Sequence, residues 1–299
     1  MDKITIRNPN TNSVLTLDCE TVPGYILKSV DWGTVKATHD SYKYVNQVGE
    51  SLTGTTLGTR EVTIEGWVVV QEDPIIMKNL KSKLNKFVNP SEQFELQYED
   101  YILSIVFDST VSYSKNESEN NDTLCKFQIT GTAFDPVFRY KQESISIFAT
   151  TVASFHFPLI ISKDLPESGL VFGKRSDSLI ATVVNDGDLP VGVKVVFKAK
   201  GPLSNPSLVN ILTQEQLQIT KEFIFGEEAE VYTSVGNKRI QGKLPTDSEW
   251  KNYFQYFSLS NDWIQIQPGV NLFRYNAETG LDNLEVSVYF RSEFLEVQG

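Results

Sequence analysis

The stretch Arg60–Val70, REVTIEGWVVV, decides the fold of this chain. Apolar residues recur at every second position along most of it, and charged or hydroxyl-bearing residues fill several of the positions between. This period of two is typical of a β-strand with one buried face and one exposed face. The side chains expected on the buried face are Val62, Ile64, Val68 and Val70.

The same alternation appears in several other places, so the chain is predicted to be mostly β. It is clear in LCKFQIT (124–130), in VKVVFKA (193–199) and in EVSVYF (285–290). Antiparallel strands that cover a core on one side have this pattern. Cys125 falls at an inward-facing position of its strand, which predicts a buried free thiol, and we expect a similar role for Cys19.

One segment breaks the period of two and predicts an amphipathic helix from about Pro74 to Val88. Asp73 can cap its first turn, and proline is well suited to the first helical position. Asn89-Pro90 ends the helix, because the residue before a proline avoids the α region. Four residues recur at helical spacing and are expected to face the first domain's sheet: Ile76, Leu80, Leu84 and Phe87.

The length of 299 residues suits two domains, and 40% apolar residues are enough to bury two cores. We place the first domain at 1–140, a linker at 141–152 and the second domain at 153–299. From Phe155 onward, short strands and regular turns predict a β-sandwich.

The charge balance argues against two classes of partner. The net charge is −11, with 38 acidic and 27 basic residues. Specific binding of nucleic acid or docking on anionic lipid would favour a basic surface. The opening MDKITIRNPN has no apolar signal-peptide core, and no apolar run is long enough to span a membrane. We therefore expect synthesis in a cytoplasm and no membrane partner.

The sequence holds no recognisable catalytic or metal-binding motif. HExxH, GxSxG, P-loop and GxGxxG patterns are absent, and the two histidines, His39 and His156, lie far apart. His156 stands between phenylalanines in FHFP, which favours a structural role. Acidic pairs such as Glu227 and Glu228 lie beside glycine, where carboxylates commonly bond to turn backbone. The chain is predicted to be no enzyme and to need no cofactor or metal.

Two further features allow either a purely structural or a functional interpretation. The segment Gly49–Thr59, GESLTGTTLGT, is either a flexible loop or an arm whose leucines become buried against a neighbouring molecule. Trp250 and Trp263 lie near turns, where they either pack in a core or stack on sugar rings.

The order of several strings resembles the siphophage distal tail proteins. These strings are ITIRN, YILKSVDWG, LGTREVTIEGWVV, LNKFVNPSEQFELQYED and FQITGTAFDPVFR in the first half. The second half continues with FHFPLII, VVNDGDLPVGVKVVFKAKGPLSNPSLVNILT, GEEAEVYTS and LSNDWIQIQPGVNLFRYNAETGLDNLEVSVYF. The resemblance covers nearly the whole chain.

This resemblance implies a first domain with a tail-tube-like β-barrel and one helix, followed by a galectin-like β-sandwich. It implies a homo-hexameric ring at the tail tip of a virion, between the tail tube protein and a hub or tail fibre protein. A receptor-binding protein would attach to the ring, and DNA would pass through it without specific binding. The inter-subunit arm of the family would correspond to Gly49, Leu52, Thr56, Leu57 and Arg60.

The sequence departs from some relatives in ways that bear on sugar binding. It has no room for a large inserted carbohydrate-binding module, and the recognisable galectin sugar-site pattern is missing. Other functions therefore stay open beside the ring subunit. One is a cell-wall carbohydrate-binding module that uses Trp250 or Trp263, and another is the tail tube protein or a tail-tip component of a phage-tail-like bacteriocin.

Overall fold

The chain folds into two compact units in a computed structural model that describes residues 3–19, 23–71, 73–148, 151–153, 173–175, 179–258 and 260–297. Unit 1 comprises Met1–Lys141 and Phe294–Gly299, and unit 2 comprises Gln142–Glu293. The end of the chain thus belongs to the first unit, which the sequence did not predict. Residues 144–148, within the predicted linker, form a strand of unit 2. His156 lies outside the described residues.

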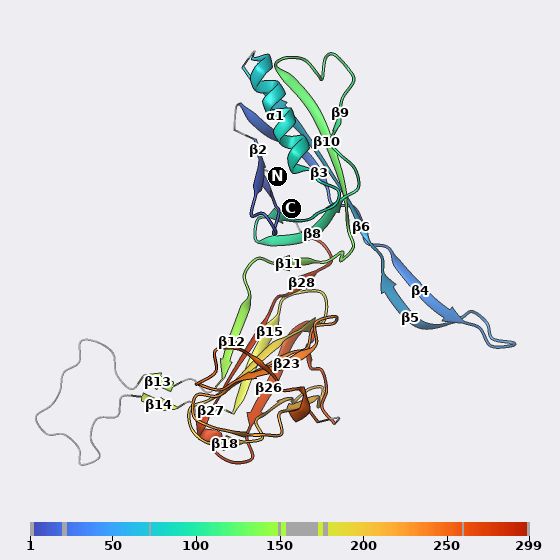
Figure 1. Ribbon diagram of the computed structural model, residues 1–299. Helices are drawn as coiled ribbons and strands as arrows, with labels where there is room; N and C mark the ends of the chain where they lie inside the picture. The colour runs from blue at the N-terminus through green and yellow to red at the C-terminus, as the bar shows by residue number, and fades with distance from the viewer. Residues whose placement is uncertain are drawn as a thin grey trace, which may run out of the picture. The chain divides into compact units, whose positions relative to one another are not determined.

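Unit 1 is built around a closed barrel (Figure 1). Its sheet follows the order β8, β7, β1, β2, β3, β6, β10, and a second pairing between β8 and β10 closes it. The bounds are β1 (Lys3–Arg7), β2 (Val14–Asp18), β3 (Gly24–Asp31), β6 (Arg60–Val69), β7 (Gln93–Tyr98), β8 (Tyr101–Phe107) and β10 (Leu124–Ala133). Three short strands extend this sheet: β9 (Ser112–Tyr113), β11 (Phe138–Tyr140) and β28 (Glu293–Phe294).

The predicted strand faces are confirmed in this barrel. All four apolar side chains singled out in Arg60–Val70 are at most 1% exposed. Strand β10 pairs with β6 along its whole length and contributes Cys125, Phe127 and Ile129 to the same core. Cys125 is a buried free thiol as expected, but Cys19 is exposed, because it directly follows the end of β2.

Helix α1 (Pro74–Phe87) packs against the barrel core through Met77 and Leu84. Asp73 caps it as predicted, since its carboxylate accepts hydrogen bonds from the N–H groups of Ile75 and Ile76 at 2.8 and 3.1 Å. The buried face of the helix begins one residue later than predicted. Met77 is buried, whereas Ile76 is 38% exposed.

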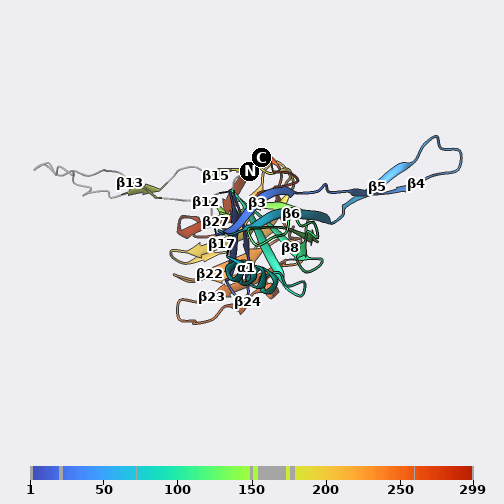
Figure 2. The ribbon, with the colours of Figure 1, turned by 90° about the horizontal axis from the view of Figure 1, so that it is seen from above.

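A separate hairpin leaves the barrel between β3 and β6. It consists of β4 (Ala37–Tyr42) and β5 (Ser51–Leu57), which pair only with each other among the described strands. Figures 1 and 2 show, from two directions, that this hairpin stands clear of the barrel strands.

Unit 2 is a sandwich of two larger sheets around one core. The six-stranded sheet has the order β12 (Ser144–Phe148), β27 (Leu284–Phe290), β17 (Lys194–Ala199), β22 (Glu228–Tyr232), β23 (Arg239–Lys243) and β24 (Lys251–Asn252). The four-stranded sheet has the order β15 (Ile180–Asn185), β26 (Gly269–Asn276), β19 (Ser207–Asn210) and β20 (Gln216–Gln218). Phe148 of the first sheet stacks on Phe273 of the second.

Short pairs and two turns of 3-10 helix complete unit 2. The pairs are β13 (Thr151–Ala153) with β14 (Gly173–Arg175), β16 (Val191–Gly192) with β25 (Gln265–Ile266), and β18 (Leu203–Ser204) with β21 (Glu222–Phe223). The 3-10 turns are η1 (Phe254–Tyr256) and η2 (Leu281–Asn283).

Candidate assembly interface

The β4–β5 hairpin, which we call the arm, is the most exposed regular element that the structure describes in unit 1. Its strands pair in antiparallel register from Ala37 opposite Leu57 to Tyr42 opposite Ser51. The register shifts once, between Asp40 and Ser41. Every residue of β4 is exposed, so the arm has no buried face of its own.

Local sequence explains why the arm is a hairpin. Threonine, which favours extended backbone, occurs three times in β5, and β4 contains Thr38 and Tyr42. The chain turns at the tip, where the backbone N–H of Gln47 donates to the carbonyl of Tyr44 at 3.1 Å. Gly49 has a φ of +81°, a conformation that glycine adopts without steric cost. Asn46 has a φ of +66°, in the same left-handed region.

Apolar side chains near the tip of the arm lie in solvent. Val45 is 92% exposed and Val48 is fully exposed. Leu52 follows on β5 and is 64% exposed. Clusters of this kind on an otherwise polar surface mark sites of protein association.

The arm holds four of the five residues predicted for it. Gly49 lies in the tip, and Leu52, Thr56 and Leu57 lie on β5. The prediction that the arm is one segment from residue 49 to residue 60 was incomplete, because β4 supplies a second strand that the sequence reasoning missed. His39 lies on that strand, and its Nδ1 is 3.0 Å from the hydroxyl oxygen of Thr55 across the hairpin.

The prediction that Arg60 belongs to the arm was wrong. Arg60 begins β6 and is only 1% exposed. Its guanidinium donates to the carbonyls of Pro136 at 2.9 Å and Trp32 at 3.2 Å, and also to the carbonyl of Leu295. Burial lowers the pKa of this guanidinium from its ordinary value. Arg60 therefore fixes the base of the arm to the body of unit 1.

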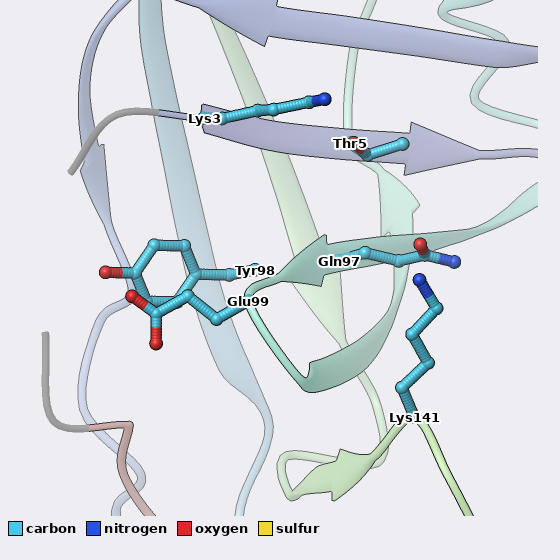
Figure 3. Close-up of a pocket in the computed structure, with 6 residues that line it drawn as sticks. All are labelled: Lys3, Thr5, Gln97, Tyr98, Glu99 and Lys141. Atoms are coloured by element: carbon cyan, nitrogen blue, oxygen red, sulfur yellow. The ribbon is translucent and has the colours of Figure 1, made fainter.

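A polar hollow of about 400 Å³ lies on the outer side of the barrel, beside β1 and β7 (Figure 3). The amine of Lys141 reaches toward the side chain of Gln97, while Glu99 lies beside Tyr98 on the other side of the hollow. The acidic and basic groups do not converge on one point, so the arrangement offers no pair for proton transfer. The remaining lining residues are Lys3 and Thr5.

Both tryptophans singled out in the sequence lie in unit 2, in different surroundings. Trp250 is 39% exposed, just before β24. Trp263 packs against Phe257, with ring centroids 4.8 Å apart, and the amine of Lys238 lies 5.1 Å from its ring centroid. Trp250 is therefore the more accessible ring, and Trp263 is part of an aromatic cluster.

The buried acid of unit 2 has a structural environment. Glu227 is fully buried, and its Oε1 lies 2.8 Å from the amine of Lys221. The hydroxyl of Tyr253 donates to the same oxygen at 2.8 Å. Across the described ranges, no group of three or more His, Cys, Asp or Glu side chains could hold a metal ion. No helix in those ranges is both long and apolar enough to cross a membrane.

Comparison with known proteins gives these features their context. The profile of the phage tail protein RIFT-related domain matches residues 17–130, from β2 into β10, and so includes the arm and α1. Residues 17–130 form a phage tail domain. This match agrees with the resemblance to siphophage tail proteins that the sequence predicted. No curated protein sequence matches the chain.

The same fold is found in a solved structure of a phage tail protein. The Dit protein of phage SPP1, described as a paradigm of the hub adsorption apparatus in phages that infect Gram-positive bacteria, superposes with a TM-score of 0.67. The identity is 10%, over 97% of this chain and 99% of that one. Two structures of the phage p2 baseplate in its activated conformation have TM-scores of 0.47 and 0.46, also at 10% identity, over 97–98% of both chains. The whole chain therefore has a Dit-like fold, mostly β with one α-helix among the described residues.

Proposed function

We propose that this protein is the subunit of a ring of six copies at the distal end of a siphophage tail. The arm is the observation that carries the proposal, because it extends from a phage tail domain and exposes apolar side chains. The ring would join the tail tube protein to a hub or tail fibre protein. It would also offer attachment to a receptor-binding protein.

The physical argument concerns the stability of the arm. An isolated two-stranded hairpin is only marginally stable in water. The arm lacks a core of its own, so a neighbouring molecule that covers Val45, Val48 and Leu52 would stabilise it. If each copy lays its arm on the next, the contact is head-to-tail, and such contacts form a closed ring when the rotation permits.

The proposed role is structural rather than enzymatic. The similar fold of SPP1 Dit, a paradigm of the hub adsorption apparatus, supports a position at the tail tip. DNA would pass through the ring without specific binding, and the acidic balance of −11 agrees with this. A lumen lined mainly by lysine and arginine would contradict that part of the proposal.

Negative-stain microscopy and native mass spectrometry of the full chain test the ring. We expect closed rings with the mass of six copies, either from the purified chain alone or after the tail tube protein is added. A protein that stays monomeric at micromolar concentration under both conditions would contradict the proposal.

A further inference from the structure

The outer face of the six-stranded sheet in unit 2 carries a row of alternating tyrosines and cations. Tyr289 lies opposite Lys194, which lies opposite Tyr232, which lies opposite Arg239. The amine of Lys194 is 4.0 Å from the ring centroid of Tyr289, and the Arg239 guanidinium carbon is 3.7 Å from that of Tyr232. The row faces outward, because the alternate positions are buried in the core: Val195, Val231, Ile240 and Val288.

This row ends at a hollow of about 280 Å³ at the edge formed by β23 and β24. Two aromatic rings beside it are open to solvent, Trp250 at 39% and Phe254 at 52% exposure. The polar side chains that line the hollow include Lys238, Arg239, Gln241 and Asn252.

The hollow is locally cationic on an acidic chain. Neither Lys238 nor Arg239 has a carboxylate partner within the described residues, whereas Lys251 is paired with Asp247 at 2.8 Å. No carboxylate is among the lining residues that the structure describes.

Three carboxylates lie on the same face of the sheet, and two of them, Glu228 and Glu285, form ion pairs with Lys198 and Lys200. Glu230 is held within the sheet, since it accepts hydrogen bonds from Tyr232 at 2.9 Å and from Gln241 at 2.6 Å. Two cations without a carboxylate partner therefore remain at the hollow to attract an anion.

These groups together match the chemistry of a charged sugar. Aromatic faces offer an apolar platform, the two side-chain amides can bond to hydroxyl groups, and the cations can pair with a carboxylate or phosphate. The volume is close to the lower end of ligand sites, roughly 300–1,000 Å³, which suits one or two sugar units. Single-stranded nucleic acid also binds through rings and cations, so oligothymidylate is included among the probes below.

We propose that the hollow beside Trp250 and Phe254 binds an anionic glycan, with Arg239 as its main charged contact and the tyrosine–cation row as the path of a longer chain. This site is independent of the ring, because it lies in unit 2 and uses no residue of the arm. The negative charge of the glycan is either a sugar carboxylate or a phosphodiester.

Isothermal titration calorimetry with the full chain tests the site. The probes are polygalacturonate, a glycerol phosphate polymer, neutral dextran and oligothymidylate. The variants are Trp250→Ala and Arg239→Gln, both at exposed positions. Tyr44→Ala and Lys78→Gln remove an exposed ring and an exposed charge from unit 1 and serve as matched controls.

We expect binding to one of the two anionic sugar polymers, which identifies the charged group. Each site variant should weaken this binding by about tenfold or more, the loss of one charge-assisted or stacking contact, while the controls leave it unchanged. Added salt should weaken it as well. The proposal is overturned if no anionic sugar polymer binds, if dextran or oligothymidylate binds more tightly, or if the site variants bind like the wild-type chain. It is also overturned if Trp250→Ala abolishes binding of a tail protein instead.

Discussion

The guanidinium carbon of Arg60 lies 4.8 Å from the centroid of the Phe138 ring. This contact joins the first residue of β6, at the base of the arm, to β11, which lies just before the chain leaves unit 1 for unit 2. The same guanidinium donates to the carbonyl of Leu295, so the segment that follows β28 is held at this point as well. The base of the arm is thus rigidly placed, although the arm itself is exposed.

Replacing Arg60 should destabilise unit 1. Arg60→Ala removes the donor to the carbonyls of Pro136 and Trp32, and buried carbonyls that lose a hydrogen bond cost free energy. We expect a loss of about 2–4 kcal/mol in the free energy of unfolding, measured by urea titration. Arg60→Lys keeps the charge but has fewer donors, so its free energy of unfolding should lie between those of the wild type and Arg60→Ala. Equal unfolding midpoints for all three proteins would show that Arg60 does not anchor the arm.

Gly66 is required where the core ring of Phe127 crosses β6. A Cβ atom built at Gly66 would lie 2.5 Å from Phe127 Cζ and 2.8 Å from the carbonyl oxygen of Ile26. Gly66→Ala should therefore cost about 1–3 kcal/mol through overpacking. Gly54→Ala in the arm is the matched control, since the nearest atom there would be 3.6 Å away. Thermal melting compares them, and similar melting temperatures would refute the close approach.

Tyr25 makes the stability of unit 1 depend on alkaline pH. Burial raises the pKa of its phenol from 10.0 to about 12, so the folded state favours the neutral form. Its contribution to stability is complete below pH 10 and is lost as the pH rises toward 12. Urea midpoints between pH 9 and 12 should fall more steeply for the wild type than for Tyr25→Phe. At neutral pH this variant should lose about 1 kcal/mol, because Tyr25 donates to the carbonyl of Leu80 at 3.0 Å. Parallel pH curves for the two proteins would be inconsistent with this pKa.

The exposed valines of the arm should matter for assembly and not for folding. The double variant Val45→Glu and Val48→Glu places charges where the neighbouring molecule would cover apolar surface, and burying them unpaired is costly. Its melting temperature as a monomer should equal that of the wild type, while native mass spectrometry should show no rings. Val235→Glu changes a valine that is 82% exposed in unit 2 and should assemble normally. Rings from the double variant would rule out a role for the tip.

Some of the fold follows from sequence periodicity, and the parts that do not follow depend on tertiary contacts. Val62, Ile64 and Val68 were predictable because a barrel strand repeats every two residues. Arg60 stands next to the glycine-rich segment, and only the positions of Pro136 and Leu295, distant in sequence, show that it is buried. Cys19 lies just past the end of a strand, and a difference of one residue in the predicted end determines whether its side chain is buried or exposed.

The two strands of the arm show the same limit. Residues 37–42 contain a histidine, an aspartate and a serine with no apolar alternation, so no buried face marks β4. In the partner strand β5, only Leu52 and Leu57 stand out from the sequence, as apolar residues in a polar segment. In the hollow of unit 2, Trp250 could be identified from its residue type, but Arg239 and Phe254 come close to it only through the pairing of β23 with β24 and the turn that follows.

A crosslink from the arm tip tests the central claim most directly. In a Cys19→Ser background, Val48→Cys can be labelled with a benzophenone maleimide, since Cys125 is buried. Irradiation of assembled rings made from mixed ¹⁴N and ¹⁵N copies should give covalent species from dimer to hexamer on denaturing gels, with crosslinked peptides of mixed isotope. Rings whose crosslinks join only residues of the same copy would contradict the account.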